Sequence, residues 1–198
     1  MTTSIIRTTD AWWVLVDGGA ARIETTAETT GELLNDRTAI DAAKTATAQA
    51  MPEHLLSPVT APCRVVAQMT NYVSHIKDSG MNPATVPMTF FRKTSHSISG
   101  PSADIVRPAH VKLLDYEVEI GLVIAKEIPV GTTITDENLP EHVAGVVVTN
   151  DVSARDLQLP KTQFFEGKSY PTFTPVGPRL VLLEAADWKH FGDLRLRT

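Results

Sequence analysis

The stretch LLDYEVEIGLVI, residues 113–124, decides how this chain folds and where its chemistry lies. Its β-branched and aromatic residues predict a β-strand, in which successive side chains point to opposite faces. Asp115, Glu117 and Glu119 then share one face, and the apolar residues after them indicate that the strand enters a core. Three carboxylates in that position repel one another and lose water, and a bound hard cation such as Mg²⁺ removes both penalties. A solvated acidic face is the alternative, and the stretch alone leaves both interpretations open.

The composition describes an ordinary globular chain with an acidic balance. Of 198 residues, 42% are hydrophobic and 21% charged, which is enough apolar material for one large domain with a small appendage. The net charge of −5 argues against nucleic acid and anionic membrane surfaces as partners. No apolar run reaches the roughly 20 residues of a membrane span, the first residues do not read as a signal peptide, and Cys63 has no second cysteine to pair with. These features predict a cytoplasmic location.

Residues 1–60 are predicted to form a small α+β unit. Residues 12–16 read as a strand, and Asp-Gly-Gly at 17–19 is a hairpin turn signal. Apolar steps of three and four predict one or two surface helices within residues 30–51. Three prolines follow, so we place a boundary near residue 60 and assign residues 61–198 to the main domain.

A short helix is predicted early in the main domain, with Thr70 or Asn71 as its cap. His75 and Asp78 would then lie three residues apart on one face. A carboxylate within reach of an imidazole fixes its tautomer and raises its basicity, as a general base requires. A plain surface helix with a casual His–Asp pair is the alternative, and these residues alone favour it.

Further polar residues follow a strongly apolar strand predicted at residues 144–149. Arg155 and Gln158 are three apart, so one helical turn would aim both the same way, and the planar fork of Arg155 suits a carboxylate ligand. A surface ion pair would explain Arg155 equally well. Lys168 precedes aromatic and proline residues that could hold an ammonium, although a surface role is the default for a single lysine.

Taken together, these segments resemble the fumarylacetoacetate hydrolase family. The matching blocks, in chain order, are Asn71-Tyr72-x-x-His75, Phe91-x-Lys93, Ser97-Ile98-x-Gly100-Pro101, residues 115–119, residues 150–158, Gly167-Lys168-Ser169 and Pro175-x-Gly177-Pro178. The resemblance implies an α+β fold that is mainly β: a β-roll of mixed sheets with short helices, preceded by the small N-terminal unit. It also implies further strands beyond Thr198, so we expect a fragment or half of a split protein.

The resemblance implies roles for particular residues. The metal ligands for Mg²⁺ or Mn²⁺ would be Glu117, Glu119 and Asp151, with Asp115 behind them. The catalytic residues would be His75 as base, Asp78 as its orienting carboxylate, and Lys168 as the group that stabilises oxyanion charge. The substrate-binding residues would be Lys93, Arg155, Gln158 and Tyr72.

The expected function is metal-dependent hydrolysis of a carbon–carbon bond in a diketo or 2-oxo acid. The metal would polarise the carbonyl and His75 would activate water. An isomerase, hydratase or decarboxylase of similar acids is the alternative within the family. A non-catalytic member, or one that needs a complementing polypeptide, is the alternative outside enzymes. Relatives of this kind imply a homodimer.

Overall fold

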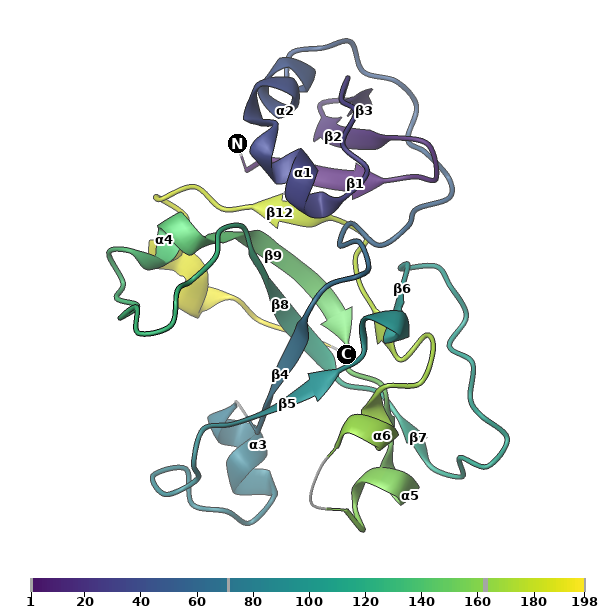
Figure 1. Ribbon diagram of the computed structural model, residues 1–198, viewed down its shortest axis with the longest axis vertical. Helices are drawn as coiled ribbons and strands as arrows, with labels where there is room; N and C mark the ends of the chain where they lie inside the picture. Colours follow the sequence, from purple (N-terminus) through teal and green to yellow (C-terminus); the bar gives the residue numbers. More distant parts are fainter. Residues whose placement is uncertain (1, 71, 162–163, 198) are drawn as a thin grey trace.

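The computed structural model describes residues 2–70, 72–161 and 164–197 (Figure 1). The strands are β1 (Ser4–Arg7), β2 (Trp12–Val16), β3 (Gly19–Arg22), β4 (Val65–Met69), β5 (Thr89–Lys93), β6 (Ile98–Ser99), β7 (Leu114–Asp115), β8 (Val118–Ile124), β9 (Val143–Asn150), β10 (Ser153–Ala154), β11 (Thr174–Pro175) and β12 (Leu180–Leu182). The helices are α1 (Thr30–Asn35), α2 (Arg37–Ala43), α3 (Val73–Asp78), η1 (Ser95–Ser97), α4 (Leu139–His142), α5 (Arg155–Gln158), α6 (Phe165–Lys168) and η2 (Trp188–Asp193). This confirms the expected α+β fold of many strands with short helices.

One antiparallel sheet of six strands runs through the molecule in the order β3-β2-β1-β12-β9-β8. Strand β1 of the N-terminal unit pairs with β12, with Ile5 opposite Leu180, and β12 pairs with β9, with Val181 opposite Val146. Figure 1 shows the N-terminal unit above β12 and the long strands β9 and β8 below it. The sheet therefore crosses the boundary placed near residue 60, and independent folding of residues 1–60 stays a prediction.

The main core is also shared across that boundary. Trp12 and Leu33 are packed in one buried cluster with Val147, Leu180 and Leu182. Because Trp12 is almost fully buried against this cluster, it serves packing and not an exposed binding face. Close approach of β9 to β12 requires glycine at 145, since a Cβ there would lie 2.0 Å from the Val181 carbonyl oxygen.

The local signals of the N-terminal unit are largely confirmed. Strands β2 and β3 form the expected hairpin, with Gly18 at a φ of +87° in the turn. The helices end at Ala43, earlier than the predicted limit of residue 51. Thr29 and Glu32 form a capping box on α1, and the carboxylate of Asp36 accepts a hydrogen bond from the Ala39 amide at the start of α2.

The prediction of one strand over residues 113–124 is wrong. The chain forms β7, breaks at Tyr116–Glu117, and resumes as β8 in a different sheet. At the break, the backbone amides bond to side chains and not to a neighbouring strand. The Tyr116 amide donates to Asp115 Oδ1 at 2.9 Å, and the Glu117 amide donates to Asn150 Oδ1 at 3.0 Å. The carboxylates consequently reach the site from two strands and the bend between them.

Three two-stranded ladders complete the fold. These are β4 with β5, β6 with β11 in parallel, and β7 with β10. Helix α3 follows β4 and lies at the edge of the molecule (Figure 1), and its N-cap position is Tyr72 without a side-chain cap bond. Thr70 is therefore not the cap that was predicted, and Asn71 lies outside the described residues. None of the described helices combines the length and apolar character needed to cross a bilayer.

Candidate active site

The site lies at the start of β8 and the end of β9, which are antiparallel neighbours, so the residues that flank these two ends meet. Pairing of these strands places Glu119 opposite Thr149 and Val118 opposite Asn150. One residue beyond each strand, the Asp151 amide donates to the Glu117 carbonyl oxygen at 2.8 Å. This backbone bond brings Asp151 and Glu117 together although they are 34 positions apart in the sequence (151 against 117).

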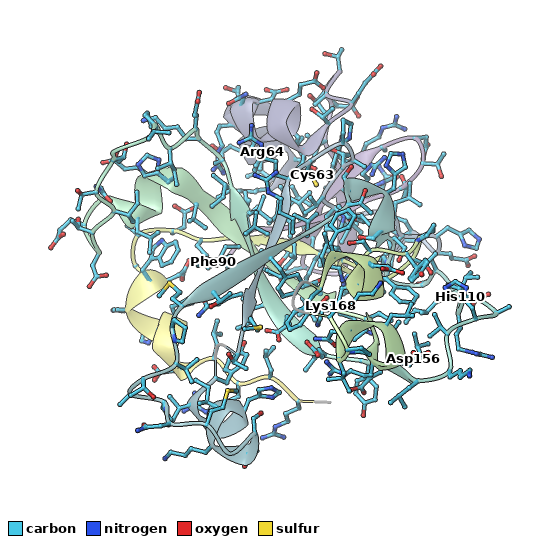
Figure 2. All side chains as sticks on the ribbon, turned by 60° about the horizontal axis from the view of Figure 1, so that its bottom comes forward. Cys63, Arg64, Phe90, His110, Asp156 and Lys168 are labelled. Atoms are coloured by element: carbon cyan, nitrogen blue, oxygen red, sulfur yellow. The ribbon has the colours of Figure 1, made fainter. Side chains whose placement is uncertain are left out.

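Lys168 links these two carboxylates. Its Nζ lies 2.6 Å from Asp151 Oδ2 and 3.1 Å from Glu117 Oε2, and its side chain is 3% exposed. Helix α6 can carry it there because Gly167 packs closely on α5 and β10, where a Cβ would meet the Ala154 carbonyl oxygen at 3.0 Å. Figure 2 shows Lys168 toward the middle of the molecule. It is a buried site lysine, and the surface alternative is wrong.

The ring of Phe91 forms one wall around that ammonium. Lys168 Nζ lies 5.2 Å from the Phe91 centroid, within the range of a cation–π contact, and Phe164 packs edge-on against the same ring. A cavity of about 220 Å³ borders this wall and is lined by Met69, Thr89, Phe90, Phe91, Arg92, Phe164 and Phe165. Apolar space therefore lies beside the charged cluster.

Lys93, at the end of β5, is buried and faces inward. Its Nζ lies 2.5 Å from Asp151 Oδ1 and donates to the Phe173 carbonyl oxygen at 2.8 Å. Desolvation lowers the pKa of Lys93, while the charge of Asp151 and its hydrogen bond oppose that shift. Asp151 is thus held by two ammonium groups, one on each oxygen.

Arg155 is the third cation of the cluster. Its Nε donates to Asp115 Oδ2 at 2.9 Å, and its Nη2 forms ion pairs with Asp115 Oδ2 at 2.8 Å and with Glu117 Oε1. Its Nη1 donates to Gln158 Oε1 at 2.8 Å, so the single turn of α5 does aim the two side chains together. The alternative of a plain surface ion pair does not describe Arg155, whose side chain is 21% exposed and pairs with the site carboxylates Asp115 and Glu117.

Glu119 differs from its neighbours because no ion pair holds it within the described residues. Desolvation raises the pKa of Glu119, and the negative charges of Glu117 and Asp151 raise it further. A hydrogen bond from the Tyr72 side chain opposes that rise. Tyr72 therefore reaches the carboxylates from the start of α3.

The predicted His75–Asp78 pair is placed differently from the other site residues. Both side chains are exposed on α3, and no hydrogen bond or ion pair joins these two described residues. The structure brings together Tyr72, Lys93, Glu117, Glu119, Asp151, Arg155, Gln158 and Lys168, and it leaves His75 and Asp78 outside that cluster.

The donor chemistry of the carboxylates fits a divalent metal ion. Glu117, Glu119 and Asp151 offer hard oxygen ligands and lie close enough to raise the pKa of Glu119. Among the described residues they are not arranged as a three-ligand group, since ammonium and guanidinium groups hold Glu117 and Asp151. Glu119, for which no ion pair is present among the described residues, is the carboxylate for which an added ion would compensate most.

Sequence reasoning missed several contributors. The Phe173 carbonyl oxygen accepts a hydrogen bond from Lys93, and the Asn150 side chain accepts one from the Glu117 amide. The types of these two residues do not indicate such contacts in the sequence. Ser153 Oγ lies 3.5 Å from Glu117 Oε1. Ser153 could have been noticed, because it stands two residues after Asp151 in the polar segment that follows β9.

Comparison with known proteins identifies the family. Residues 64–198 match the sequence model for the C-terminal part of fumarylacetoacetate hydrolase. The chain belongs to the fumarylacetoacetate hydrolase family. Human oxaloacetate tautomerase FAHD2A, a mitochondrial protein by its name, is 39% identical over 137 residues, which are 68% of this chain and 42% of that protein.

Solved structures of the family carry the same fold. The fumarylacetoacetate hydrolase from Exiguobacterium antarcticum is 31% identical with a TM-score of 0.75, over 92% of this chain and 67% of that one. The 5-carboxymethyl-2-hydroxymuconate delta-isomerase from Mycobacterium smegmatis is 26% identical with a TM-score of 0.65, over 94% of this chain and 68% of that one. The chain spans less than half the length of the curated relatives that it matches.

Proposed function

We propose that this chain carries the metal-binding and acid–base part of an enzyme that shifts a proton in a small 2-oxo acid, by keto–enol tautomerisation or double-bond isomerisation. The observation that carries the proposal is the cluster in which the buried Lys168 and Asp151 meet the half-buried Glu117, beside Glu119, which has no ion pair among the described residues. Relatives named as oxaloacetate tautomerases support proton transfer over bond cleavage.

With a divalent ion bound, the net charge of the cluster would favour an anionic substrate. Asp115, Glu117, Glu119 and Asp151 stand against Lys93, Arg155 and Lys168, a formal charge of −1. A divalent ion held by Glu117, Glu119 and Asp151 would make the charge positive and would polarise the oxygens of a bound 2-oxo acid. Cytoplasmic location and a homodimer stay predictions.

The chain's own groups would divide the proton transfer between them. Lys168 Nζ donates a hydrogen bond to the substrate oxygen that becomes the enolate, in a buried setting where such a bond is strong. His75 would accept the proton from the carbon next to the carbonyl. It is exposed on α3 outside the cluster, and this helix is linked to the site at its N-cap, where the Tyr72 side chain bonds Glu119. The cavity beside Phe91 receives the remaining end of the substrate.

Carbon–carbon hydrolysis remains the second candidate, because the chain shares its fold with a fumarylacetoacetate hydrolase at a TM-score of 0.75. The two activities give different products. Tautomerisation leaves the composition of the acid unchanged, whereas hydrolysis of an acylpyruvate yields two acids.

The test offers the chain two substrates in the presence of Mg²⁺. Enol-enriched oxaloacetate is followed by ultraviolet absorbance, and an acylpyruvate by proton NMR for released pyruvate. We expect Mg²⁺-dependent loss of the enol without pyruvate release, and a roughly 10²–10³-fold slower reaction for Lys168→Met. The control is Lys126→Met, which removes an exposed lysine outside the site and is expected to leave the rate unchanged. Pyruvate release would favour the hydrolase, and no turnover of either substrate would overturn the proposal.

A further inference from the structure

Among the cations of the cluster that the structure describes, the Asp115 side chain contacts Arg155 directly. Arg155 Nε donates to Asp115 Oδ2, Arg155 Nη2 forms an ion pair with the same oxygen at 2.8 Å, and Oδ1 accepts from the Tyr116 amide. Asp115 has no ion pair with Lys93 or Lys168 within the described residues. Any effect of Asp115 on the metal-ligand carboxylates must therefore pass through Arg155 or through its charge at a distance.

Arg155 divides its donors between two carboxylates. Nε donates to Asp115 Oδ2 and Nη1 donates to Gln158 Oε1, while Nη2 forms ion pairs with both Asp115 Oδ2 and Glu117 Oε1. A guanidinium carries five N–H donors in a fixed fork, so a hydrogen used by Asp115 is not available to Glu117. Asp115 thereby limits how strongly Arg155 holds Glu117.

This matters because both oxygens of Glu117 already face cations. Oε1 faces Arg155 and Oε2 faces Lys168 at 3.1 Å. A metal ion that uses Glu117 competes with these cations for the same oxygens. A tighter Arg155–Glu117 pair would weaken metal binding, and an Arg155 restrained elsewhere would allow it.

We propose that Asp115 is a positioning residue that restrains Arg155 and so keeps Glu117 available to a divalent metal ion. The inference rests on the proposed function, because it takes Glu117 to be a metal ligand. It assigns to Asp115 a role through Arg155, and it assigns to Arg155 a role in setting metal affinity as well as in meeting substrate.

The experiment measures Mn²⁺ affinity of the whole chain by water-proton relaxation, with no substrate present. The variants are Asp115→Asn, Arg155→Gln and the double variant. Asparagine keeps the shape and the acceptor for the Tyr116 amide, so it removes charge without removing that bond. We expect Asp115→Asn to weaken Mn²⁺ binding about tenfold, the scale of changes in residues behind metal ligands. In the Arg155→Gln background, Asp115→Asn should lower the Mn²⁺ affinity by no more than about twofold. Asp115 acts through Arg155 in this proposal, so the effects of the two substitutions should not add.

Two controls separate position from charge. Glu166→Gln removes one negative charge from α6, where Glu166 pairs with Lys161 at the surface, and it should weaken binding less than about twofold. Asp115→Glu keeps the charge and should bind within about threefold of the unchanged chain, which provides a folded variant if Asp115→Asn does not fold.

The outcomes are distinct. Wild-type chain that binds no Mn²⁺ would overturn the metal site and this inference together. Wild-type binding with an equal loss for Asp115→Asn in both backgrounds would overturn the inference alone. So would a loss for Glu166→Gln as large as that for Asp115→Asn, or a tenfold loss for Asp115→Glu.

Discussion

At the scale of single residues, the site is built from carboxylates whose charges are unequally balanced. Asp151 is held by Lys93 and Lys168, and Glu117 by Lys168 and Arg155. Glu119 has a hydrogen bond from Tyr72 and like charges around it. An ionised carboxylate in that position costs free energy in the folded state, which explains why the pKa of Glu119 is raised.

The raised pKa of Glu119 predicts a pH dependence of stability. Folding favours the protonated form, so this residue's contribution is fully present below its unfolded pKa and is lost as the pH rises through its folded pKa. We expect Glu119→Gln to raise the melting temperature of the metal-free chain at pH 7 by about 2–4 °C, the shift that roughly 1 kcal/mol gives at this size. At pH 4 the difference should vanish. Thermal melts with EDTA across this pH range measure it.

The same variant should lose the response to metal. Mg²⁺ is expected to raise the melting temperature of the unchanged chain and to have little effect on Glu119→Gln. A melting temperature that falls at pH 7 on substitution, or an unchanged Mg²⁺ response, would contradict this account of Glu119. Glu184→Gln, in a carboxylate distant in sequence from the cluster, serves as the control.

At the scale of elements, the two helices of the N-terminal unit, α1 and α2, are stabilised by side-chain caps. Helix α1 has a capping box in which the Thr29 side chain accepts from the Glu32 amide and the Glu32 carboxylate accepts from the Thr29 amide. The backbone bonds to Glu32 lower its pKa, with Thr29 the larger cause, and this keeps the carboxylate ionised.

We expect Thr29→Ala to destabilise the chain by about 1 kcal/mol, the usual cost of a lost N-cap. Urea denaturation measures the free energy of unfolding. Thr47→Ala, in an exposed threonine after α2, is the matched control and should leave stability within about 0.5 kcal/mol. Mn²⁺ affinity should not change in either variant, and equal losses of stability in both would contradict the capping role.

At the scale of the whole molecule, β12 joins the two parts of the chain. It lies between β1 and β9 in the six-stranded sheet, and Leu180 and Leu182 are buried in the shared core. Strands that share one sheet and one core should unfold together. The boundary near residue 60 would then separate two segments of sequence and not two folding units.

Leu180→Ala tests this cooperativity. A buried leucine replaced by alanine costs about 2–5 kcal/mol. In a Trp188→Phe background, the fluorescence of Trp12 and Trp13 reports on the N-terminal unit, and Mn²⁺ binding reports on the site. We expect both signals to be lost in one transition, at a lower urea concentration than in the unchanged chain. Loss of the site signal with the tryptophan signal intact would show that residues 1–60 fold on their own.

The sequence by itself determined the family, the α+β class, the hairpin at β2–β3 and the buried strand β9, because turn chemistry, alternation and apolar runs are local signals. The sequence also identified most residues of the cluster, because the order and spacing of its motifs resemble those of the family. The break between β7 and β8, by contrast, depends on Asn150 meeting the Glu117 amide, a contact between distant segments.

Only the tertiary structure decided which charges meet. Lys93, Arg155 and Lys168 come from β5, α5 and α6, and their distances to Glu117 and Asp151 follow from how those elements pack. The exposure of His75 and the joining of β1 to β12 are likewise set by packing. The physical reason is common to all of them. Ion pairing and burial depend on distances in space, which residue order does not contain.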